Sequence, residues 1–502
     1  MKRHIYRMIA CLLLATALFG AVPTSASAAF EDVPAGSWAE ASITRCVQSG
    51  LFQGETATRF GMGKPMTRAA FTVVLCRFFG WELIAPEHST YTDVQDPARW
   101  YYSAVETAFA HGAITLQTEN FRPNDAITRE EMAVMLVRAL GYTALAGKAQ
   151  EMEIPFTDVT TNKGYIAMAY EMGIINGTSA TTFSPERTAT REQAAVMLMR
   201  LYDKYNCPAA SLTGMVSDQE GSNLSGYDTV VISGGRLSYT NRVLMTRPGE
   251  TRETALVEAI HGNHSKALLQ VVCNASALKG KTREMATTLV SALQESSYDG
   301  LYLTFPDLDA SRTSAMSALV KATNELLASD KLLYVEVKAP SRNSENSRIY
   351  PYSELAAVAD RLVLQIAPYQ IWDGKLMSAP VEPLEEVYYA LAELNDSVPA
   401  DKLCLQLTTA TTIWQDNRIS GTVNADDLQK LLSNESTQLY YSEYYKCAYL
   451  QQTGVTPARV AWYLNEQAVR ERVQLCGLFG VTNVYLGDHS MVSPEIFAGL
   501  KK

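Results

Sequence analysis

Three acidic residues stand where a sheet-based enzyme could hold catalytic carboxylates. Asp307 and Asp309 follow the apolar, strand-like run Gly300–Phe305, and Glu336 lies inside a second such run, Leu332–Lys338. Carboxyl groups at strand ends can donate or accept a proton in general acid–base catalysis. The favoured alternative is structural. The two aspartates would then shape a turn or cap a helix, and Glu336 would pair with the lysine two residues later.

Three arginines could bind an anion. Arg68, Arg129 and Arg191 each follow a threonine and open an amphipathic, helix-like stretch. A cation in the first helical turn opposes the helix dipole, so helix formation does not explain it. Beside the free N–H groups of a helix start, a guanidinium would suit an anionic ligand. The alternative is a structural ion pair with a neighbouring repeat.

These arginines belong to three repeats about sixty residues apart. The repeats open on Phe30–Val33, Tyr91–Val94 and Phe156–Val159, which read FEDV, YTDV and FTDV. Each then gives a helix-like stretch, an aromatic residue, a polar loop and the Thr-Arg pair. Thr128 with Glu131 fits a capping box at that last helix. Each unit is therefore predicted to fold as helix, loop, helix.

Two tryptophans accompany the repeats. Trp38 and Trp100 follow the first two opening motifs, where the third repeat offers Tyr165. An indole can pack in a core or give a flat face to a sugar ring. We favour a core position with partial exposure and keep both tryptophans as candidates for binding a polymer.

With these motifs the sequence resembles the S-layer homology (SLH) family, over about residues 30–205. The resemblance implies an all-α domain that holds a secreted protein on the cell wall of a Gram-positive-type envelope. Its ligand would be an anionic secondary cell-wall polymer, bound through the three arginines. The predicted repeat boundaries are 29–84, 88–147 and 153–205.

Short β-rich runs alternate with helical ones in the second half of the chain, after a predicted linker at 206–224. The strand candidates are 228–233, 267–273, 300–305, 332–338, 361–367, 402–408, 459–464 and 483–488. Eight such units over 225–502 predict an α/β fold, a closed (β/α)8 TIM-type barrel, with an open doubly wound sheet as the alternative.

The order of these segments resembles the chitinase-like glycoside hydrolases of family 18, remotely and over the whole C-terminal half. The run YDGLYLTFPD is similar to the family's D-G-x-D-x-D-x-E strand. On that mapping the three aspartates fall on Asp299, Tyr302 and Thr304, and the proton-donating glutamate falls on Pro306. Proline has no proton to donate, so the resemblance implies a barrel that has lost its acid.

A later strand supports the same conclusion, since the family's Tyr-Asp pair falls on Ala367 and Pro368. Aromatic rings at strand ends could still stack on sugars without cleaving them, and barrel packing is the alternative. The candidates for glycan binding in the barrel are Asp299, Tyr302, Tyr369 and Trp414. Asp488 and His489, at the end of the last strand candidate, are interpreted as polar rim.

Composition limits the remaining functions. The chain has 502 residues and a net charge of -10, without a long basic run, which disfavours binding to nucleic acid or an anionic membrane. Residues 1–28 are typical of a signal peptide, with basic residues before the apolar run Met8–Val22 and a small-x-small site at Ala26–Ala28. A retained membrane anchor is the alternative. No later segment is long and apolar enough to span a bilayer.

Eight scattered cysteines specify no disulfide framework, and no metal site or cofactor is expected. Two hypotheses remain. The first is a wall-anchored protein whose barrel binds a glycan without catalysis. The second is a wall-anchored glycoside hydrolase with relocated carboxylates. A pure S-layer lattice protein differs from the first only in self-assembly.

Overall fold

The computed structural model describes residues 30–205, 207–217, 224–240, 242–342, 344–366, 378–380, 382–416, 418–454 and 458–500. The chain divides into two compact units. One comprises residues 1–141 and 184–199, and the other comprises 142–183 and 200–502. No helix among the described residues is long and apolar enough to cross a membrane.

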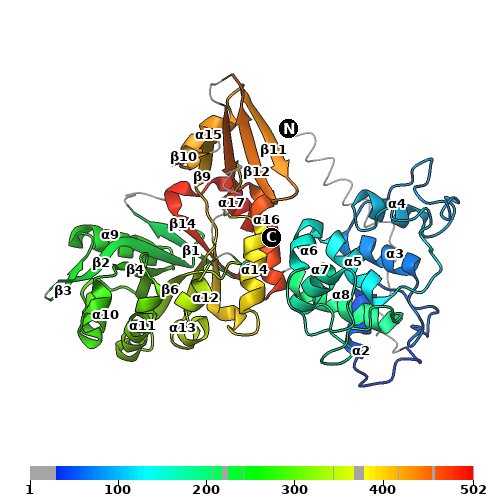
Figure 1. Cartoon of the computed structure of the whole chain (residues 1–502), viewed down its shortest axis with the longest axis horizontal. Helices are drawn as coiled ribbons and strands as arrows, with labels where there is room; N and C mark the ends of the chain where they lie inside the picture. Colours follow the sequence, from blue (N-terminus) through cyan, green and yellow to red (C-terminus); the bar gives the residue numbers. More distant parts are fainter. Residues whose placement is uncertain are drawn as a thin grey trace. The chain divides into compact units, whose positions relative to one another are not determined.

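The first unit is helical (Figure 1). Its helices are α2 (Glu40–Gln48), α3 (Arg68–Phe79), α4 (Tyr102–Ala110), α5 (Arg129–Ala139) and the start of α8 (Arg191–Tyr205). Thr67 and Thr128 cap α3 and α5, each accepting a backbone N–H through its side chain. The predicted capping box is confirmed at Thr128, where Glu131 reaches back to the threonine N–H.

Three backbone hydrogen bonds form a closed ring in this unit. The N–H of Met66 donates to Ala189, that of Ala189 to Ile127, and that of Ile127 to Met66, at 2.8, 2.9 and 2.8 Å. All three residues are buried, and each stands immediately before a Thr-Arg pair. The ring therefore fixes the starts of α3, α5 and α8 around one centre.

The second unit contains a closed barrel. Its strands are β1 (Ser211–Val216), β2 (Thr229–Tyr239), β4 (Lys266–Cys273), β5 (Gly300–Thr304), β6 (Leu332–Lys338), β7 (Arg361–Gln365), β8 (Leu403–Gln406) and β14 (Asn483–Asp488). Neighbouring strands are parallel, and β1 pairs with both β14 and β2. These pairings close the sheet, so the barrel prediction is confirmed and the open sheet is excluded. Strand β3 (Val243–Thr246) extends β2 antiparallel.

Two strand predictions were wrong. Strand β1 lies inside the stretch 206–224 that was predicted as a linker, because its short run SLTGMV carries polar residues and a glycine. The predicted strand 459–464 is β13, which belongs to another sheet. The predicted number of eight barrel strands is still correct, because the missed strand β1 takes the place of the misassigned strand β13. YDGLYLTFPD therefore contains the fourth barrel strand, not the third.

Helices follow most barrel strands. They are α9 (Glu250–Gly262), α10 (Thr282–Ser296), α11 (Thr313–Leu326), α12 (Asn346–Ile349), α13 (Tyr352–Val358), α14 (Leu384–Leu394), α16 (Glu466–Leu478) and α17 (Pro494–Leu500). Single 3₁₀ turns lie at Ala277–Lys279, Ala310–Arg312, Ala400–Lys402 and His489–Met491. Helix α6 (Thr143–Ala149), at the end of the second predicted repeat, and helix α7 (Lys163–Glu171) of the third repeat also belong to this unit.

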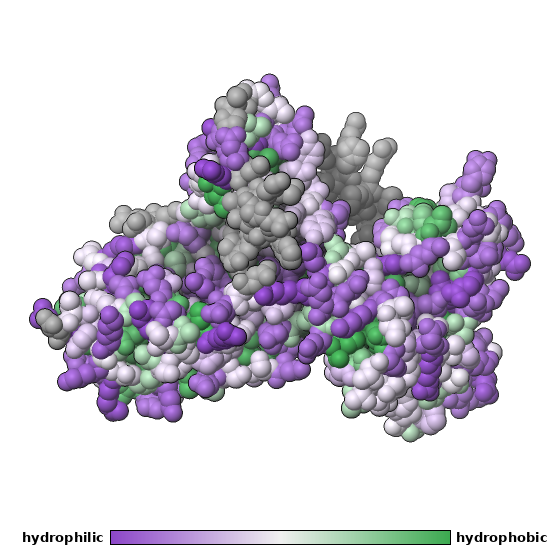
Figure 2. All heavy atoms as spheres, viewed as in Figure 1, coloured by the Kyte–Doolittle hydropathy of each residue, from purple (hydrophilic) through white to green (hydrophobic). Residues whose placement is uncertain are grey.

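A buried layer of side chains drawn from seven barrel strands forms a hydrophobic cluster inside the barrel. Its members are Val231, Leu268, Tyr302, Tyr334, Val363, Cys404 and Tyr485. Successive side chains of a strand point to opposite faces, so the residue two positions after each layer member also points inward. On the visible face of the molecule, hydrophobic residues form only small patches among hydrophilic ones (Figure 2).

A second, antiparallel sheet is inserted between β8 and β14, drawn in orange in Figure 1. Its strand order is β10 (Arg418–Val423), β9 (Thr411–Gln415), β13 (Arg459–Tyr463), β12 (Cys447–Gln452), β11 (Thr437–Ser442). Helix α15 (Ala425–Leu432) covers one face, where its Leu428 packs with Ala448, Leu450 and Ala461. We call this element the inserted sheet.

Candidate functional sites

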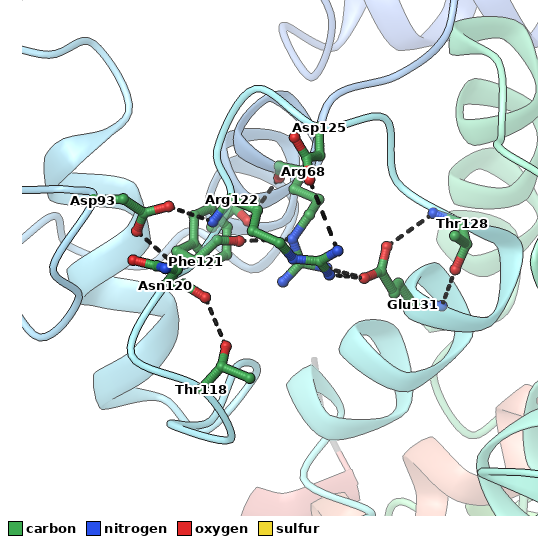
Figure 3. Close-up of polar contacts among 10 residues, drawn as sticks. Arg68, Asp93, Thr118, Asn120, Phe121, Arg122, Asp125, Thr128 and Glu131 are labelled. Carbon is green, nitrogen blue, oxygen red and sulfur yellow. Dashed lines mark hydrogen bonds and ion pairs between the residues drawn. The ribbon is translucent and has the colours of Figure 1, made fainter.

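The aspartate of each opening motif holds the aromatic loop of its own repeat. Asp93 accepts the N–H groups of Phe121 and Arg122, each at 2.7 Å (Figure 3). Asp32 does the same for the loop that begins at Phe60, and Asp158 accepts the N–H of Phe183 at 2.8 Å. The motif is therefore explained by loop structure, without a ligand.

Acid is expected to weaken the loop of the first repeat. Burial opposes the charge of Asp32, yet N–H donors from Phe60, Gly61 and Met62 hold its pKa below the ordinary value. A lowered carboxyl pKa stabilises the fold when the pH is above the pKa of the unfolded chain, about 3.9. This stabilisation is lost as the pH falls through the pKa of the folded state. Asp32→Asn should lower the thermal midpoint at neutral pH and flatten its fall below pH ~4. Glu31→Gln, at an exposed neighbour, should change neither quantity.

The guanidinium of Arg68 is engaged between two repeats (Figure 3). Its Nε donates to the carbonyl of Phe121 at 2.8 Å, and its Nη1 lies 2.6 Å from Oε1 of Glu131. Arg122 binds the same carboxylate oxygen, while Oε2 accepts the N–H of Thr128 at 3.0 Å. One carboxylate thus joins two arginines and a helix cap, as in the structural alternative considered for Arg68.

Arg191 makes the equivalent contact with the first repeat. Its Nε donates to the carbonyl of Phe60 at 3.0 Å, and its Nη2 donates to that of Gln53 at 2.8 Å. The guanidinium lies 4.9 Å from the centre of the Phe60 ring. Arg129 is buried, and its N–H donates to the carbonyl of Arg187 at 3.0 Å. The guanidinium groups of Arg68 and Arg191, and the backbone N–H of Arg129, therefore join neighbouring repeats around the central ring.

A hollow of about 610 Å³ opens beside this junction in the second repeat. It is lined by Thr92, Asp93, Val94, Gln95, Asp96, Arg99, Tyr101, Asn120, Arg122, Pro123, Asn124 and Asp125. Sequence analysis missed Arg99 and Arg122 here. A sequence signal exists for Arg122, because this arginine stands where the other repeats have Gly61 and Ser184. All three residues adopt a positive φ, which is 61° for Arg122. Arginine rarely adopts this conformation.

The preferred core position of the two tryptophans was wrong. Trp38 and Trp100 are 62% and 64% exposed, whereas Tyr165, their counterpart in the third repeat, is buried. Both tryptophans lie in the turn before a helix, α2 or α4, and not on the buried face of that helix. The Trp100 ring contacts that of Tyr101 edge-on, with ring centres 5.3 Å apart, and most of its surface faces solvent.

Asp299 lies at the amino end of β5, away from the carboxyl-end face where barrel sites form. Its carboxylate accepts the N–H of Ala267 at 2.8 Å and lies 2.8 Å from Nε2 of His261. Asp228 and Asp360 bind the start of a neighbouring strand in the same way. The residue mapped to the family's first aspartate thus has a structural role here.

Tyr302 and Glu336 meet inside the barrel. The hydroxyl of Tyr302 donates to Oε2 of Glu336 at 2.8 Å, and the Tyr302 ring stacks on Tyr485 with centres 5.4 Å apart. Burial raises the pKa of Glu336, and the Tyr302 hydrogen bond opposes this shift. The partner of Glu336 is therefore Tyr302, where the structural alternative had named Lys338.

Glu336 is the one carboxylate among the inward positions above the buried layer on the described strands β4 to β8. By strand alternation these positions carry Gln270, Thr304, Glu336, Gln365 and Gln406. Neutral hydrogen-bonding groups dominate this end of the barrel. Such groups suit an uncharged polar ligand such as a sugar.

Asp309 and Asp307 do not join Glu336. Asp309 caps the 3₁₀ turn at Ala310, accepting the N–H of Ser311 at 2.9 Å and pairing with Arg312. The hydroxyl of Ser311 also donates to Asp309 and contributes most to lowering its pKa, with smaller contributions from the Ser311 N–H and Arg312. Asp307 is exposed, and its carbonyl accepts from Arg312 at 3.3 Å. Asp488 likewise caps a turn, accepting the N–H of Ser490 at 2.9 Å.

Trp414 is not a barrel residue. It lies buried in β9 of the inserted sheet, opposite Val460 and Ile419. Tyr369, Ala367 and Pro368 lie outside the described residues. Within the described part of the chain, no cluster of three His, Cys, Asp or Glu side chains could hold a metal ion.

A buried ion pair was also missed. Glu382 and Arg472 line a small cavity of about 20 Å³ with Thr408 and Trp462. Burial raises the pKa of Glu382 to about 7, against the opposing effects of Arg472 and Thr408. In sequence, both residues resemble solvent-exposed helix charges, so no local signal identifies the pair.

Comparison with known proteins gives the N-terminal family. The model of the S-layer homology domain matches residues 29–72, 90–133 and 155–195. An exoglucanase, XynX, from Acetivibrio thermocellus is 33% identical over 36% of this chain and 17% of its own length. An S-layer protein from Bacillus thuringiensis subsp. finitimus is 26% identical over 42% of this chain and 26% of its own. The chain thus spans about a fifth of these relatives' length.

Solved structures give the fold of the second half. A chitinase from Chromobacterium violaceum aligns with a TM-score of 0.52 at 18% identity, over 58% of this chain and 98% of its own. The Bacillus cereus spore cortex-lytic enzyme SleL aligns at 0.50 with 8% identity, over 66% of this chain and 83% of its own. Identities this low establish the fold alone.

The family match and the S-layer relatives indicate a secreted cell-surface protein of the Gram-positive type. The closed barrel and its structural neighbours give the architecture that follows the repeats. The chain therefore carries three S-layer homology domains followed by a TIM barrel with the fold of the chitinase-like family 18 glycoside hydrolases.

Proposed function

We propose that the SLH repeats hold this protein on an anionic secondary cell-wall polymer, and that the barrel displayed there binds a glycan without cleaving it. The exposed rings of Trp38 and Trp100 support the first part, since an indole face stacks on sugars. The hollow of the second repeat adds Arg99 and Arg122, which pair with Asp96 and Glu131 and whose other N–H groups suit carboxylate or phosphate.

One observation supports a barrel without catalysis: the carboxyl end of its fourth strand has no acid. Thr304 is buried there, Pro306 follows it, and the nearest aspartates cap a turn or face solvent. Hydrolysis of a glycosidic bond needs a proton donor at the leaving oxygen. The amide and hydroxyl groups above the buried layer can still bind sugar hydroxyls.

The alternative is an active glycoside hydrolase in which Glu336 has replaced the lost acid. Its inward position and raised pKa favour this function, because a neutral carboxylic acid can protonate a leaving oxygen. Tyr302 and Glu336 would then form the proton-donating pair, on the fourth and fifth strands.

Incubation of the purified protein with β-1,4-linked N-acetylglucosamine hexamer and with peptidoglycan is expected to release no reducing sugar. Binding of the hexamer, measured by calorimetry, should persist in the same preparation. Release of reducing ends that Glu336→Gln abolishes would overturn this proposal in favour of the hydrolase. Asp309→Asn, which alters a turn cap, is the matched control.

Wall attachment is tested with the whole mature chain, because helix α7 of the third repeat belongs to the barrel unit. The protein should sediment with purified wall sacculi. It should remain in solution once the secondary polymer has been extracted from them. Equal sedimentation with extracted and intact sacculi would contradict polymer binding.

A further inference from the structure

The inserted sheet has two outer strands, β10 and β11, which pair on one side only within the described residues. Figure 1 shows β11 along the outer border of the orange sheet. An outer strand presents unpaired N–H and C=O groups that can pair with another strand. Proteins usually protect such edges with charges, prolines or bulges.

The two edges differ in this protection. Strand β10 begins with Arg418 and has a break in register between Ile419 and Gly421. Strand β11 reads TQLYYS, with no charge and no proline, and all six of its residues pair with β12 in unbroken register. Among the described residues, edge β11 is therefore neutral and regularly paired, without the features that protect β10.

Large side chains are exposed on both faces of β11. Leu439 is 55% exposed on the face that carries α15, since it lies opposite Leu450 of that core. Tyr440 is 40% exposed on the other face. A flat ligand such as a sugar would meet one face only. Exposure on both faces of one strand instead favours continuation of the sheet by a further strand.

The exposed Tyr440 ends a row of aromatic rings that crosses the sheet. Its ring stacks on Tyr449 with centres 5.1 Å apart and planes 17° apart, and Tyr449 lies 4.7 Å from Trp462. The outer side of the Tyr440 ring has no ring partner among the described residues. A strand added at β11 would lie about 4.8 Å away, which is the spacing of this row.

We infer that β11 pairs antiparallel with β11 of a second copy of this chain, with the two Tyr440 residues opposite each other. This two-fold arrangement joins the inserted sheets of two molecules into one and continues the aromatic row across the junction. The strand is neutral, and pairing about Tyr440 places residues 438–442 of the two copies opposite each other, so the strand is complementary to itself. A different protein would need its own matching strand.

The pairing is expected to be weak in dilute solution. One strand of six residues offers far less than the ~1,600 Å² that a stable interface buries. Anchoring many copies on one wall raises their effective concentration, so the same contact would then join neighbours. This inference goes beyond the proposed function, and its solution test does not depend on wall binding.

Substitutions of opposite charge at Tyr440 test the pairing in the full mature chain. Sedimentation velocity over a concentration series should show monomer–dimer exchange for the unmodified protein. Tyr440→Lys and Tyr440→Glu should each weaken dimerisation about tenfold or more, since like charges then lie opposite each other. Mixing the two variants should restore it. Ile419→Lys, on edge β10 with 54% exposure, should leave it unchanged.

Cysteine trapping supplies a second measurement suited to a weak dimer. Tyr440→Cys should form a disulfide between copies under mild oxidation, because directly opposed Cβ atoms lie about 4.5–5.5 Å apart. Leu439→Cys should not, since it would face Tyr441 of the second copy. A protein that stays monomeric and gives no trapped dimer would overturn the inference. Equal trapping at both positions, or equal loss with Ile419→Lys, would also overturn it.

Discussion

Replacing Arg472 with alanine is expected to lower the free energy of unfolding of the barrel unit by about 3–5 kcal/mol. The Arg472 side chain is fully buried and donates to the carbonyls of Lys446, Ala468 and Glu382, at 2.8, 3.1 and 2.7 Å. It therefore joins the inserted sheet, helix α16 and the segment before α14. The variant leaves these carbonyls and a buried carboxylate without their cation.

The matched control is Arg470→Ala on the same helix. Arg470 is partly exposed and pairs with the exposed Glu466, and ion pairs near the surface contribute about 0.2–1 kcal/mol. Denaturant unfolding of both variants separates a buried contact from a general effect of losing arginine. Equal losses in the two variants would contradict the central role given to Arg472.

The loss of stability caused by Arg472→Ala should depend on pH. The pKa of Glu382 is already raised to about 7 by burial, and removal of Arg472 would raise it further. A raised carboxyl pKa destabilises the fold as pH rises above the unfolded value. The loss caused by Arg472→Ala should therefore be larger at pH 8 than at pH 5, where Glu382 is protonated. An effect independent of pH would show that the carboxylate is not involved.

The repeats were predictable because local signals and tertiary contacts agree. The Thr-Arg pairs start helices, and the capping box at Thr128 needs only neighbours in sequence. The burial of Trp38 and Trp100 was misjudged because hydrophobicity does not say which side of a turn faces solvent. The sharing of Glu131 by Arg68 and Arg122 was equally hidden, since it joins loops of different repeats.

The alternation of strand-like and helix-like runs predicted the barrel, but the sequence identified its individual strands less well. Runs such as VAWYL and NVYLGD are equally apolar, yet one enters the inserted sheet and the other the barrel. The sequence also placed Asp299 correctly at the start of a strand. It did not show that Asp299 therefore lies at the amino-end face of the barrel, which stabilises the fold, and not at the carboxyl-end face, where active sites form. Only the register of β5 and β6 brings Tyr302 to Glu336.

Replacing Trp38 and Trp100 together with alanine is expected to weaken binding to wall sacculi about tenfold or more. Each indole in contact with a sugar contributes on the order of 0.5–1.5 kcal/mol, and 1.4 kcal/mol corresponds to a factor of ten. Since both rings are more than half exposed, their removal should leave the thermal midpoint nearly unchanged. Sedimentation of the full chain with increasing amounts of sacculi measures the change.

Leu116→Ala is the matched control, because this leucine of the second repeat is exposed to a similar degree, 57%. If it weakens binding equally, exposed apolar surface in general would explain attachment, and the tryptophans would have no special part. The single variants carry further information. Equal losses at Trp38 and Trp100 would mean that repeats one and two each hold polymer, whereas a loss confined to Trp100 would assign binding to the repeat whose hollow contains Arg99 and Arg122.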